Sequence, residues 1–492
     1  MRLNPLLWFG TRRDVRPGSR FPIRLVSGLS LAVTREEYDA VRQKRVRRHM
    51  DKVGFRTLCH APFTTLDFSP EGYVTPCNHF WRPLATANAA FSIMELWDGA
   101  GLQEIRDHMI DYALDQAACR SCVRQIVAGQ HEQAFPVVQF DSRPARSRRP
   151  AYPKRLIFRM GNTCNLACVM CDGSTSSRIR SEFERLPPLI PAYGERFFEE
   201  LEEILPHVEH LEFYGGEPFL VSEHLRVLDL VEKKNPRCSI YVNTNAMSLT
   251  GSTKGLLERL NFTAIAISMD AVSKDVHEQV RYGLKSERFY DAVDYLLDLR
   301  KRKRGLALTL NVTEHRKNWF ELPEVFRFAE RRGLDVHINT CIHPENVTLY
   351  TLPTEELRYV LEFTVEECAR LCEEFAPFKA LRSYDFYISL MRAELANRDP
   401  HWKGGDVPAS ALTDGKLGVP IPGLAPLSTP ARVMTEIDRT GVLGSAARAR
   451  FLEEMERHLR ALAGADGWSQ ALERVEQERV RLDLRAPVAT LG

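Results

Sequence analysis

Residues 161–171 read Gly161-Asn162-Thr163-Cys164-Asn165-Leu166-Ala167-Cys168-Val169-Met170-Cys171, a C-x3-C-x2-C run. The run comes just after residues 156–158, a short apolar segment typical of a buried strand. Three thiols on one short loop suit a compact cluster better than a zinc finger, whose ligands come as two separated pairs. A [4Fe-4S] cluster with three cysteine ligands leaves one iron open, and an open iron binds a small molecule directly. The sequence therefore predicts such a cluster at the end of a strand.

Five more short apolar, β-branched segments follow, and a helical pattern separates each from the next. They lie at residues 211–214, 239–242, 264–267, 308–312 and 336–339. Alternation of strands and helices predicts parallel strands joined by crossover helices. Six βα units are too few for a closed eight-stranded barrel. We therefore expect an α/β fold built on a partial (β/α)6 barrel, with its chemistry where the strands end.

Polar or glycine-rich segments accompany four of these strands. They are Gly215-Gly216-Glu217-Pro218, Asn243-Thr244-Asn245, Ser268-Met269-Asp270 and, within the fifth strand, Asn311. Glycine lets the backbone approach a ligand closely, and a carboxylate is a suitable partner for an ammonium group.

Taken in this order, the cysteine loop and the four segments resemble the radical S-adenosylmethionine (SAM) superfamily over about residues 154–341. The resemblance implies that a [4Fe-4S] cluster is held by the catalytic cysteines Cys164, Cys168 and Cys171. It implies that SAM is bound by Gly215, Gly216, Glu217, Thr244, Asn245, Ser268, Asp270 and Asn311, with Glu217 near the methionine ammonium. Met170 departs from the family, where an aromatic residue often stands, and this weakens packing on the adenine edge but not cluster ligation.

The same resemblance implies the reaction. SAM chelates the open iron through its amino and carboxylate groups, and an electron from the reduced cluster cleaves a carbon–sulfur bond. The products are methionine and a 5′-deoxyadenosyl radical, which abstracts hydrogen from a substrate, while the protein supplies placement and excludes water. We expect an enzyme that draws on an electron donor such as a flavodoxin or a ferredoxin.

A second group of cysteines precedes the barrel. Cys59 and Cys77 bracket Gly72 in the pattern C-x12-G-x4-C, and Cys119 and Cys122 follow a helical stretch at about residues 93–112. This arrangement is similar to the SPASM module, or to its shortened twitch form. The resemblance implies one auxiliary [4Fe-4S] cluster held by these four cysteines. A structural zinc site stays open as the alternative, because spacing alone does not separate the two.

Two features depart from that module. It normally follows the barrel, and its longer form carries further cysteines where residues 123–163 have none. A cluster with four protein ligands has no open iron, so we expect it to transfer electrons or to stabilise the fold. His60 and His79 lie beside two of the cysteines, and we expect surface or hydrogen-bonded histidines there rather than ligands.

Composition divides the chain into five segments. We expect a basic N-terminal segment at residues 1–50, the auxiliary module at 51–135, a linker at 136–153, the barrel at 154–345 and a mostly helical region at 346–492. In the last region, residues 355–374 and 446–462 have the periodicity of amphipathic helices, and a Gly/Pro-rich linker is expected at 398–432.

The overall composition is that of a globular enzyme, with 44% hydrophobic and 27% charged residues and a net charge of +2. No window approaches the roughly 18 uninterrupted apolar residues of a membrane span, and residues 3–10 are too short for a signal peptide. We therefore expect a cytoplasmic protein with neither a membrane nor a nucleic-acid partner. Eleven cysteines in a reducing compartment indicate metal binding rather than disulfides.

Cys341 ends the sixth strand, where a thiol is a candidate hydrogen-atom donor to a substrate radical. A buried, inert cysteine is the alternative. The expected substrate is a peptide or protein side chain, or a small metabolite. Two other functions stay open: an enzyme acting on a carbohydrate-type molecule with purely structural N-terminal cysteines, and a non-catalytic iron-sulfur redox sensor. The intact Glu217 argues against a sensor, which has no need to hold SAM.

Overall fold

The computed structural model describes residues 22–398, except 27, 29, 51–52, 89, 128–134 and 376–380. Residues 1–21 of the expected basic segment, almost all of the Gly/Pro-rich linker and the helix expected at 446–462 lie outside the described residues. No helix in the described part is both long and apolar enough to cross a bilayer.

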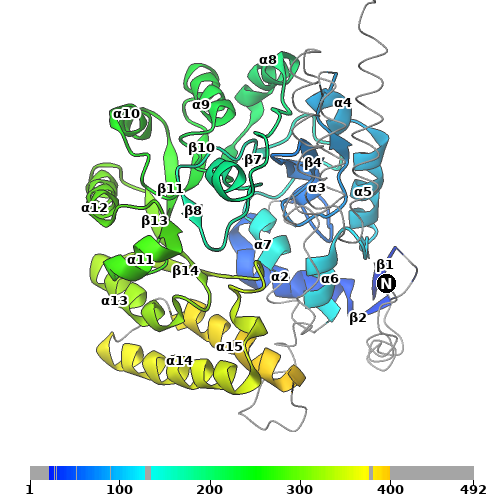
Figure 1. Cartoon of the computed structure of the whole chain (residues 1–492). Coiled ribbons are helices and arrows are strands. Elements are labelled where there is room, and N and C mark those ends of the chain that lie inside the picture. The colour runs from blue at the N-terminus through cyan, green and yellow to red at the C-terminus, as the bar shows by residue number, and fades with distance from the viewer. Residues whose placement is uncertain are drawn as a thin grey trace, which may run out of the picture.

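Six parallel strands form the core of the molecule, as the sequence predicts. They are β7 (Arg155–Phe158), β9 (His210–Phe213), β10 (Ser239–Thr244), β11 (Phe262–Ser268), β13 (Ala307–Glu314) and β14 (Asp335–Thr340). The strands lie side by side in chain order, and each pairs in parallel with the next. Crossover helices cover their outer side in Figure 1: α8 (Glu195–Ile204), α9 (Ser222–Lys234), α10 (Gly251–Arg259), α12 (Ser286–Arg302) and α13 (Leu322–Arg332). The prediction of a partial (β/α)6 barrel is confirmed.

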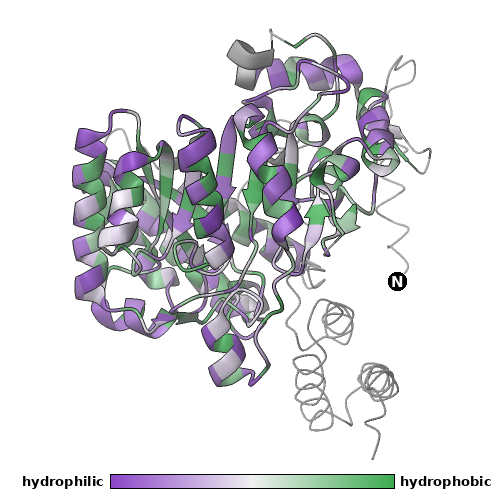
Figure 2. Cartoon of the chain, turned by 90° about the horizontal axis from the view of Figure 1, so that it is seen from above, coloured by the Kyte–Doolittle hydropathy of each residue, from purple (hydrophilic) through white to green (hydrophobic). Residues whose placement is uncertain are grey.

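The two faces of this sheet differ in polarity because side chains alternate along a strand. On β13, Leu308, Leu310 and Val312 are buried, whereas Thr309 and Asn311 are half-buried. The apolar set packs against the helices, whose hydrophobic sides face the sheet in Figure 2. The inner face of the curved sheet is therefore the polar one.

The sheet continues beyond the barrel into the segment of the second cysteine group. Strand β3 (Thr65–Phe68) pairs in parallel with β7, and β4 (Tyr73–Thr75) and β5 (Ala85–Thr86) add antiparallel strands. The result is one nine-stranded sheet. Gly72 turns the chain between β3 and β4 with a φ of 82°, and an added Cβ would lie 2.8 Å from the Cβ of Ala192. Glycine is needed there.

Shorter elements complete the N-terminal part. The helices are α2 (Arg35–Met50), α3 (Ala61–Thr64), α4 (Ile93–Trp97), α5 (Ala100–Ile110), α6 (Arg120–Val127) and α7 (Phe135–Asp141), and the strands of a small second sheet are β1 (Pro22–Leu25), β2 (Ser30–Thr34) and β6 (Ala113–Leu114). Arg42 of α2 is fully buried, although it begins the most basic run of the chain. It donates through Nε to Asp141 of α7 at 2.8 Å, so this ion pair joins α2 to α7.

Two long helices follow the barrel, α14 (Thr354–Glu374) and α15 (Leu381–Arg398). The Ser383 hydroxyl of α15 donates to the Val336 carbonyl of β14 at 2.8 Å, which attaches the helix to the edge strand of the sheet. The expected amphipathic helix at residues 355–374 corresponds to α14.

Candidate active site and auxiliary cysteine site

Cys164, Cys168 and Cys171 lie on the loop that leaves the carboxyl end of β7. Within the loop, the two-residue strand β8 (Ala167–Cys168) pairs antiparallel with β12 (Arg281–Tyr282), which follows helix α11 (Lys274–Val280). The register places Cys168 opposite Arg281. All three thiols are free.

Hydrogen-bond donors surround the sulfurs of this loop. Cys164 Sγ accepts from the Leu166 N–H at 3.5 Å and from Asn245 Nδ2 at 3.8 Å, and Cys168 Sγ accepts from an Arg281 amino group at 3.7 Å. Burial raises the pKa of Cys164 to about 12. The pKa of Cys168 is lowered, first by a hydrogen bond from the Cys171 thiol and then by the charge of Arg281. Metal-ligating thiolates are typically surrounded by hydrogen-bond donors in this way. These residues therefore fit the [4Fe-4S] cluster that the sequence resemblance implies.

The Gly215-Gly216 turn packs directly on the cysteine loop. Both glycines have positive φ, 74° and 52°. A Cβ on Gly216 would lie 2.5 Å from the Thr163 carbonyl oxygen, and the Glu217 N–H donates to that same oxygen at 2.8 Å. The close approach requires glycine, and it makes the turn and the cysteine loop one unit.

The Glu217 carboxylate is completely buried and is met by donors of its own chain. The Thr244 and Ser248 hydroxyls each donate to it at 2.7 Å, and the Asn245 backbone N–H donates at 2.8 Å. Burial raises the pKa of Glu217, and these hydrogen bonds act in the opposite direction. The side chain thus ties the turn after β9 to the segment after β10.

Asn245 connects the segment after β10 to the cysteine loop as well. Its Nδ2 donates to Asn165 Oδ1 at 2.9 Å, in addition to its contact with Cys164, and its Oδ1 accepts from the Met247 N–H at 2.9 Å. Thr244 and Asn245 therefore lie beside Glu217, in the group that the sequence predicts.

Ser268 and Asn311 pair in register across β11 and β13. The Ser268 hydroxyl donates to Asn243 Oδ1 at 3.3 Å, and Asn311 Oδ1 accepts from Asn339 Nδ2 at 2.6 Å. These contacts form a polar row across the inner face of the barrel, at the strand ends.

Asp270 is engaged differently. It is fully buried, its Oδ1 accepts from the Thr313 N–H at 2.8 Å, and its Oδ2 lies 2.8 Å from Arg281 Nε. The carboxylate therefore holds the guanidinium that contacts Cys168. The sequence did not indicate Arg281 as a site residue, because a two-residue strand is too short to show a strand periodicity. Only the pairing of β8 with β12 brings Arg281 to Cys168.

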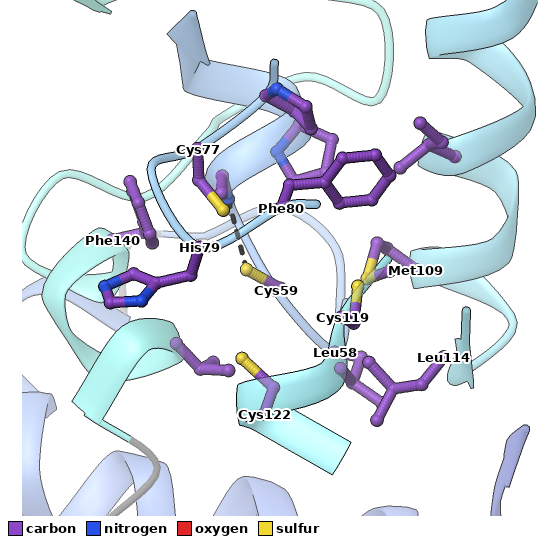
Figure 3. A pocket seen from close by; sticks show the side chains of 15 residues that line it. Leu58, Cys59, Cys77, His79, Phe80, Met109, Leu114, Cys119, Cys122 and Phe140 are labelled. Carbon is purple, nitrogen blue, oxygen red and sulfur yellow. Dashed lines mark hydrogen bonds between the residues drawn. The ribbon is translucent and has the colours of Figure 1, made fainter. Parts of the chain in front are cut away.

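The second group of cysteines surrounds a cavity (Figure 3). Cys59, Cys77, Cys119 and Cys122 line it, together with apolar side chains that include Leu58, Phe80, Ile105, Met109, Leu114, Val137 and Phe140. The thiols come from the segment before α3, the segment after β4, and α6 with the residue just before it. Four thiols around an apolar enclosure have the donor chemistry that a fully ligated cluster or zinc requires.

Burial raises the pKa of all four thiols, that of Cys59 to about 12. Ligation must therefore release their protons. His60 Nδ1 accepts from the Ala145 N–H at 3.3 Å, which confirms a hydrogen-bonded histidine at this position. His79 lines the cavity, and burial lowers its pKa to about 4. Among the described residues, no three His, Cys, Asp or Glu side chains are placed to hold a single metal ion.

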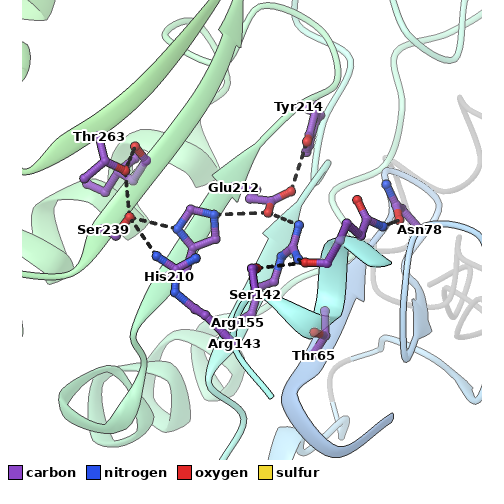
Figure 4. Close-up of polar contacts among 12 residues, drawn as sticks. Thr65, Asn78, Ser142, Arg143, Arg155, His210, Glu212, Tyr214, Ser239 and Thr263 are labelled. Atoms are coloured by element: carbon purple, nitrogen blue, oxygen red, sulfur yellow. Dashed lines mark hydrogen bonds and ion pairs between the residues drawn. The ribbon is translucent and has the colours of Figure 1, made fainter. Parts of the chain in front are cut away.

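A polar network connects this module to the inner face of the barrel (Figure 4). His210 and Tyr214 contact the Glu212 carboxylate at 3.1 and 2.9 Å, and Arg155 pairs with the same carboxylate. Arg155 also donates to the Gln139 carbonyl of α7 at 3.4 Å, and Gln139 Nε2 donates to Asn78, the residue after Cys77, at 3.3 Å.

Cys341 lies at the end of β14 and is 2% exposed. Its N–H donates to Glu314 Oε2 at 2.8 Å, and its thiol donates to the His343 carbonyl at 3.4 Å. Burial raises its pKa to about 12. The structure thus places it among the buried groups beneath the strand ends.

Two family models match the chain. Residues 158–329 match the radical SAM superfamily, and residues 59–123 match an iron-sulfur cluster-binding domain, SPASM. The first match begins at the last residue of β7 and covers β9, β10, β11 and β13, and the second covers all four cysteines around the cavity. No curated protein matches the chain.

Solved structures with a likeness to the chain include SuiB of Streptococcus suis bound to S-adenosylmethionine, with 16% identity, 44% of this chain and 45% of that chain covered, and a TM-score of 0.30. Another is anSMEcpe with bound AdoMet and Cp18Cys peptide, with 20% identity, 43% and 60% coverage, and a TM-score of 0.32. A third is TYW1 with a lysine-pyruvate adduct, with 14% identity, 43% and 72% coverage, and a TM-score of 0.27. The chain thus spans less than two thirds of the first two.

The family assignment rests on the two family models and on the site geometry that agrees with them. The family uses a [4Fe-4S] cluster with SAM, and the SPASM domain binds an auxiliary iron-sulfur cluster. Residues 158–329 therefore match the radical SAM superfamily, and residues 59–123, which precede the barrel, match the SPASM domain.

Proposed function

We propose that this enzyme oxidatively modifies a peptide or protein side chain, with both cysteine groups holding [4Fe-4S] clusters. Cys164, Cys168 and Cys171 hold the cluster that binds SAM, and Cys59, Cys77, Cys119 and Cys122 hold the auxiliary one. The observation that carries the cofactor part of the proposal is the packing of Gly216 on Thr163, which joins the Gly215-Gly216-Glu217 turn to the cysteine loop.

When bound, the cluster and SAM supply reductive cleavage of a carbon–sulfur bond and the hydrogen abstraction that follows. The chain's own residues place these groups. Gly216 lets the turn pack on the cysteine loop, and Glu217 fixes the turn through Thr244, Asn245 and Ser248. Ser268 and Asn311 offer a hydroxyl and an amide to the ribose from the inner face of the barrel.

The auxiliary site is well placed to exchange electrons with the barrel. Strand β3 runs parallel to β7, and β4 returns antiparallel, with Thr75 opposite Asp67. Cys77 therefore lies towards the start of β3, and the SAM loop lies beyond the end of β7. The two are separated along the strands by at least one four-residue strand, roughly 13 Å, and across the sheet by two strand spacings, roughly 10 Å. Oxidation of a side chain releases electrons, and a closed cluster at this place can accept them.

The SPASM type of the module supports a peptide or protein substrate. The alternative is a carbohydrate-type or other small-molecule substrate, with N-terminal cysteines that are purely structural. The tests must distinguish this alternative from a peptide or protein substrate. A flavodoxin or ferredoxin as electron donor and Cys341 as hydrogen-atom donor stay proposals of the same kind.

Iron counting tests the cofactor assignment. Anaerobically reconstituted protein should hold about eight irons per chain if two four-iron clusters form. The triple variant of Cys164, Cys168 and Cys171 to Ala should hold about four irons and release no 5′-deoxyadenosine from SAM under titanium(III) citrate. Four irons and one zinc in the wild type would contradict the auxiliary cluster.

The substrate class needs a separate experiment. Loaded enzyme, SAM and reductant are incubated with a size-fractionated extract of the host, and mass changes are followed alongside 5′-deoxyadenosine. A mass loss of two hydrogens in a peptide or protein fraction supports the proposal. Turnover confined to the small-molecule fraction would contradict the substrate class and leave the cofactor assignment intact.

A further inference from the structure

Arg281 is a buried cation that contacts Cys168. Arg281 is 8% exposed, and its guanidinium lies between two partners, with Nε 2.8 Å from Asp270 Oδ2 and an amino group 3.7 Å from Cys168 Sγ. Pairing of β8 with β12 holds the two backbones in register, so the contact does not depend on a flexible loop.

Asp270 fixes the orientation of this guanidinium. Its own position is fixed by the Thr313 N–H at 2.8 Å and, through its backbone carbonyl, by Asn318 Nδ2 at 2.9 Å. The negative end of the ion pair thus points towards β13 and the positive end towards the cysteine.

Two histidines close to the pair add no charge. His277 and His315 are both fully buried, and burial lowers the pKa of each to about 4, with the charge of Arg281 acting in the same direction. Among the described residues, Arg281 and Asp270 are the charged groups that act on the Cys168 thiol. In a buried environment such charges are weakly screened.

We infer that Arg281, oriented by Asp270, raises the reduction potential of the cluster held by Cys164, Cys168 and Cys171, and so makes it reducible by a physiological donor. The inference rests on the proposed function. Reduction adds one electron, taken from a low-potential one-electron donor, and breaks no bond. The added negative charge is stabilised by a nearby cation and by an N–H···S hydrogen bond, which are known to raise iron-sulfur potentials.

Arg281 is a positioning residue in this proposal, so the test measures a potential rather than activity alone. Reconstituted full-length enzyme is titrated anaerobically against titanium(III) citrate and followed by electron paramagnetic resonance. Addition of SAM changes only the signal of the cluster with the open iron, which separates it from the auxiliary cluster. In Arg281→Gln, the ratio of reduced to oxidised cluster at a fixed solution potential should fall about tenfold, equivalent to about 59 mV for one electron.

Two further variants serve as controls. Arg281→Lys keeps the charge and should stay within about threefold of the wild-type ratio. Arg178→Gln removes an arginine that donates to the Asn165 carbonyl of the same loop at 3.3 Å but contacts none of its sulfurs, and should leave the ratio unchanged. If Arg281→Gln binds no iron, the test rests on Arg281→Lys. A tenfold fall in its ratio of reduced to oxidised cluster would contradict the inference, because it would show that the positive charge does not set the potential.

An unchanged potential in iron-loaded Arg281→Gln would overturn the inference. If SAM affinity then fell instead, Arg281 would be a SAM ligand. Absence of any SAM-responsive signal in the wild type would instead contradict the proposed function, so the two failures are distinguishable.

Discussion

The backbone N–H of Asn245 donates to the carboxylate of Glu217 at 2.8 Å, and the Asn245 side chain contacts Asn165 and Cys164 in the cysteine loop. One residue therefore joins the turn after β9 to the cysteine loop. The Gly215-Gly216-Glu217 turn and the cysteine loop are thus joined through a fully buried carboxylate, which is costly to separate from its donors.

Replacing Glu217 by Gln should weaken both this connection and SAM binding. The amide nitrogen cannot accept from Thr244, Ser248 or the Asn245 N–H, so at least one buried donor loses its acceptor, at a cost of about 1 to 3 kcal/mol. We expect a lower unfolding midpoint and about tenfold weaker SAM binding, with the iron content unchanged. Glu202→Gln, on an exposed ion pair with Lys234, is the control. Weaker SAM binding without loss of stability would mean that the carboxylate contacts the ammonium directly.

Gly216→Ala tests the packing of the turn on the loop. The alanine would adopt a φ of 52° and place its Cβ 2.5 Å from the Thr163 oxygen, so the loop must shift. Strain of this kind costs on the order of 1 to 3 kcal/mol. Thermal unfolding should occur at lower temperature, and SAM affinity should fall. Gly251→Ala, where nothing lies within 4 Å of the added Cβ, should change neither, and equal behaviour of the two variants would refute the argument.

The auxiliary site is tested by replacing Cys119 and Cys122 with Ala. Iron should fall to about four per chain. SAM cleavage should persist, because the other cysteine group is intact, while conversion of the substrate collapses for lack of an electron acceptor. Circular dichroism and thermal unfolding must show a folded protein, since loss of a ligated cluster can unfold its module. Cys372→Ala, on α14, is the matched control. Wild-type turnover in a folded double variant would make the module purely structural.

Glu314 provides a pH dependence whose sign can be derived. Its carboxyl is fully buried, accepts from the Cys341 N–H at 2.8 Å, and burial raises its pKa well above 4.5. The unfolded chain loses this proton near pH 4.5 and the folded chain keeps it, so folding takes up a proton above that pH. Stability from this group is therefore fully present below about pH 4.5 and is lost as the pH rises towards the folded pKa.

Glu314→Gln, which is neutral at every pH, should remove this dependence. The free energy of unfolding of the variant minus that of the wild type should increase by up to about 1.4 kcal/mol per pH unit above pH 5. The increase should stop once the pH passes the pKa of Glu314 in the folded protein. Urea unfolding of the two proteins between pH 5 and 8 measures the difference. The exposed Glu355→Gln on α14 should show no such trend. A difference between wild type and Glu314→Gln that does not vary with pH would show that Glu314 is ionised in the folded protein.

The order of motifs along the chain was enough to predict the barrel and much of its site. Parallel strands bring their carboxyl ends to one edge, so segments that follow successive strands must meet there wherever the helices lie. That reasoning predicts that Cys164, Gly216, Asn245 and Ser268 lie close together, although it gives no distance between them. It also grouped the four cysteines of the SPASM domain, because their spacing is that of a known module.

Only the tertiary structure decided what each polar side chain contacts. Glu217 meets Thr244 and Ser248, and Asp270 meets Arg281, because these partners depend on the register of β8 with β12 and on turns whose geometry no local pattern encodes. The pairing of β3 with β7 could not be predicted from the sequence either, because the sequence of a four-residue strand does not indicate which strand it pairs with. Local periodicity determines which residues form strands, whereas pairing between distant segments is decided by the packing of the whole chain.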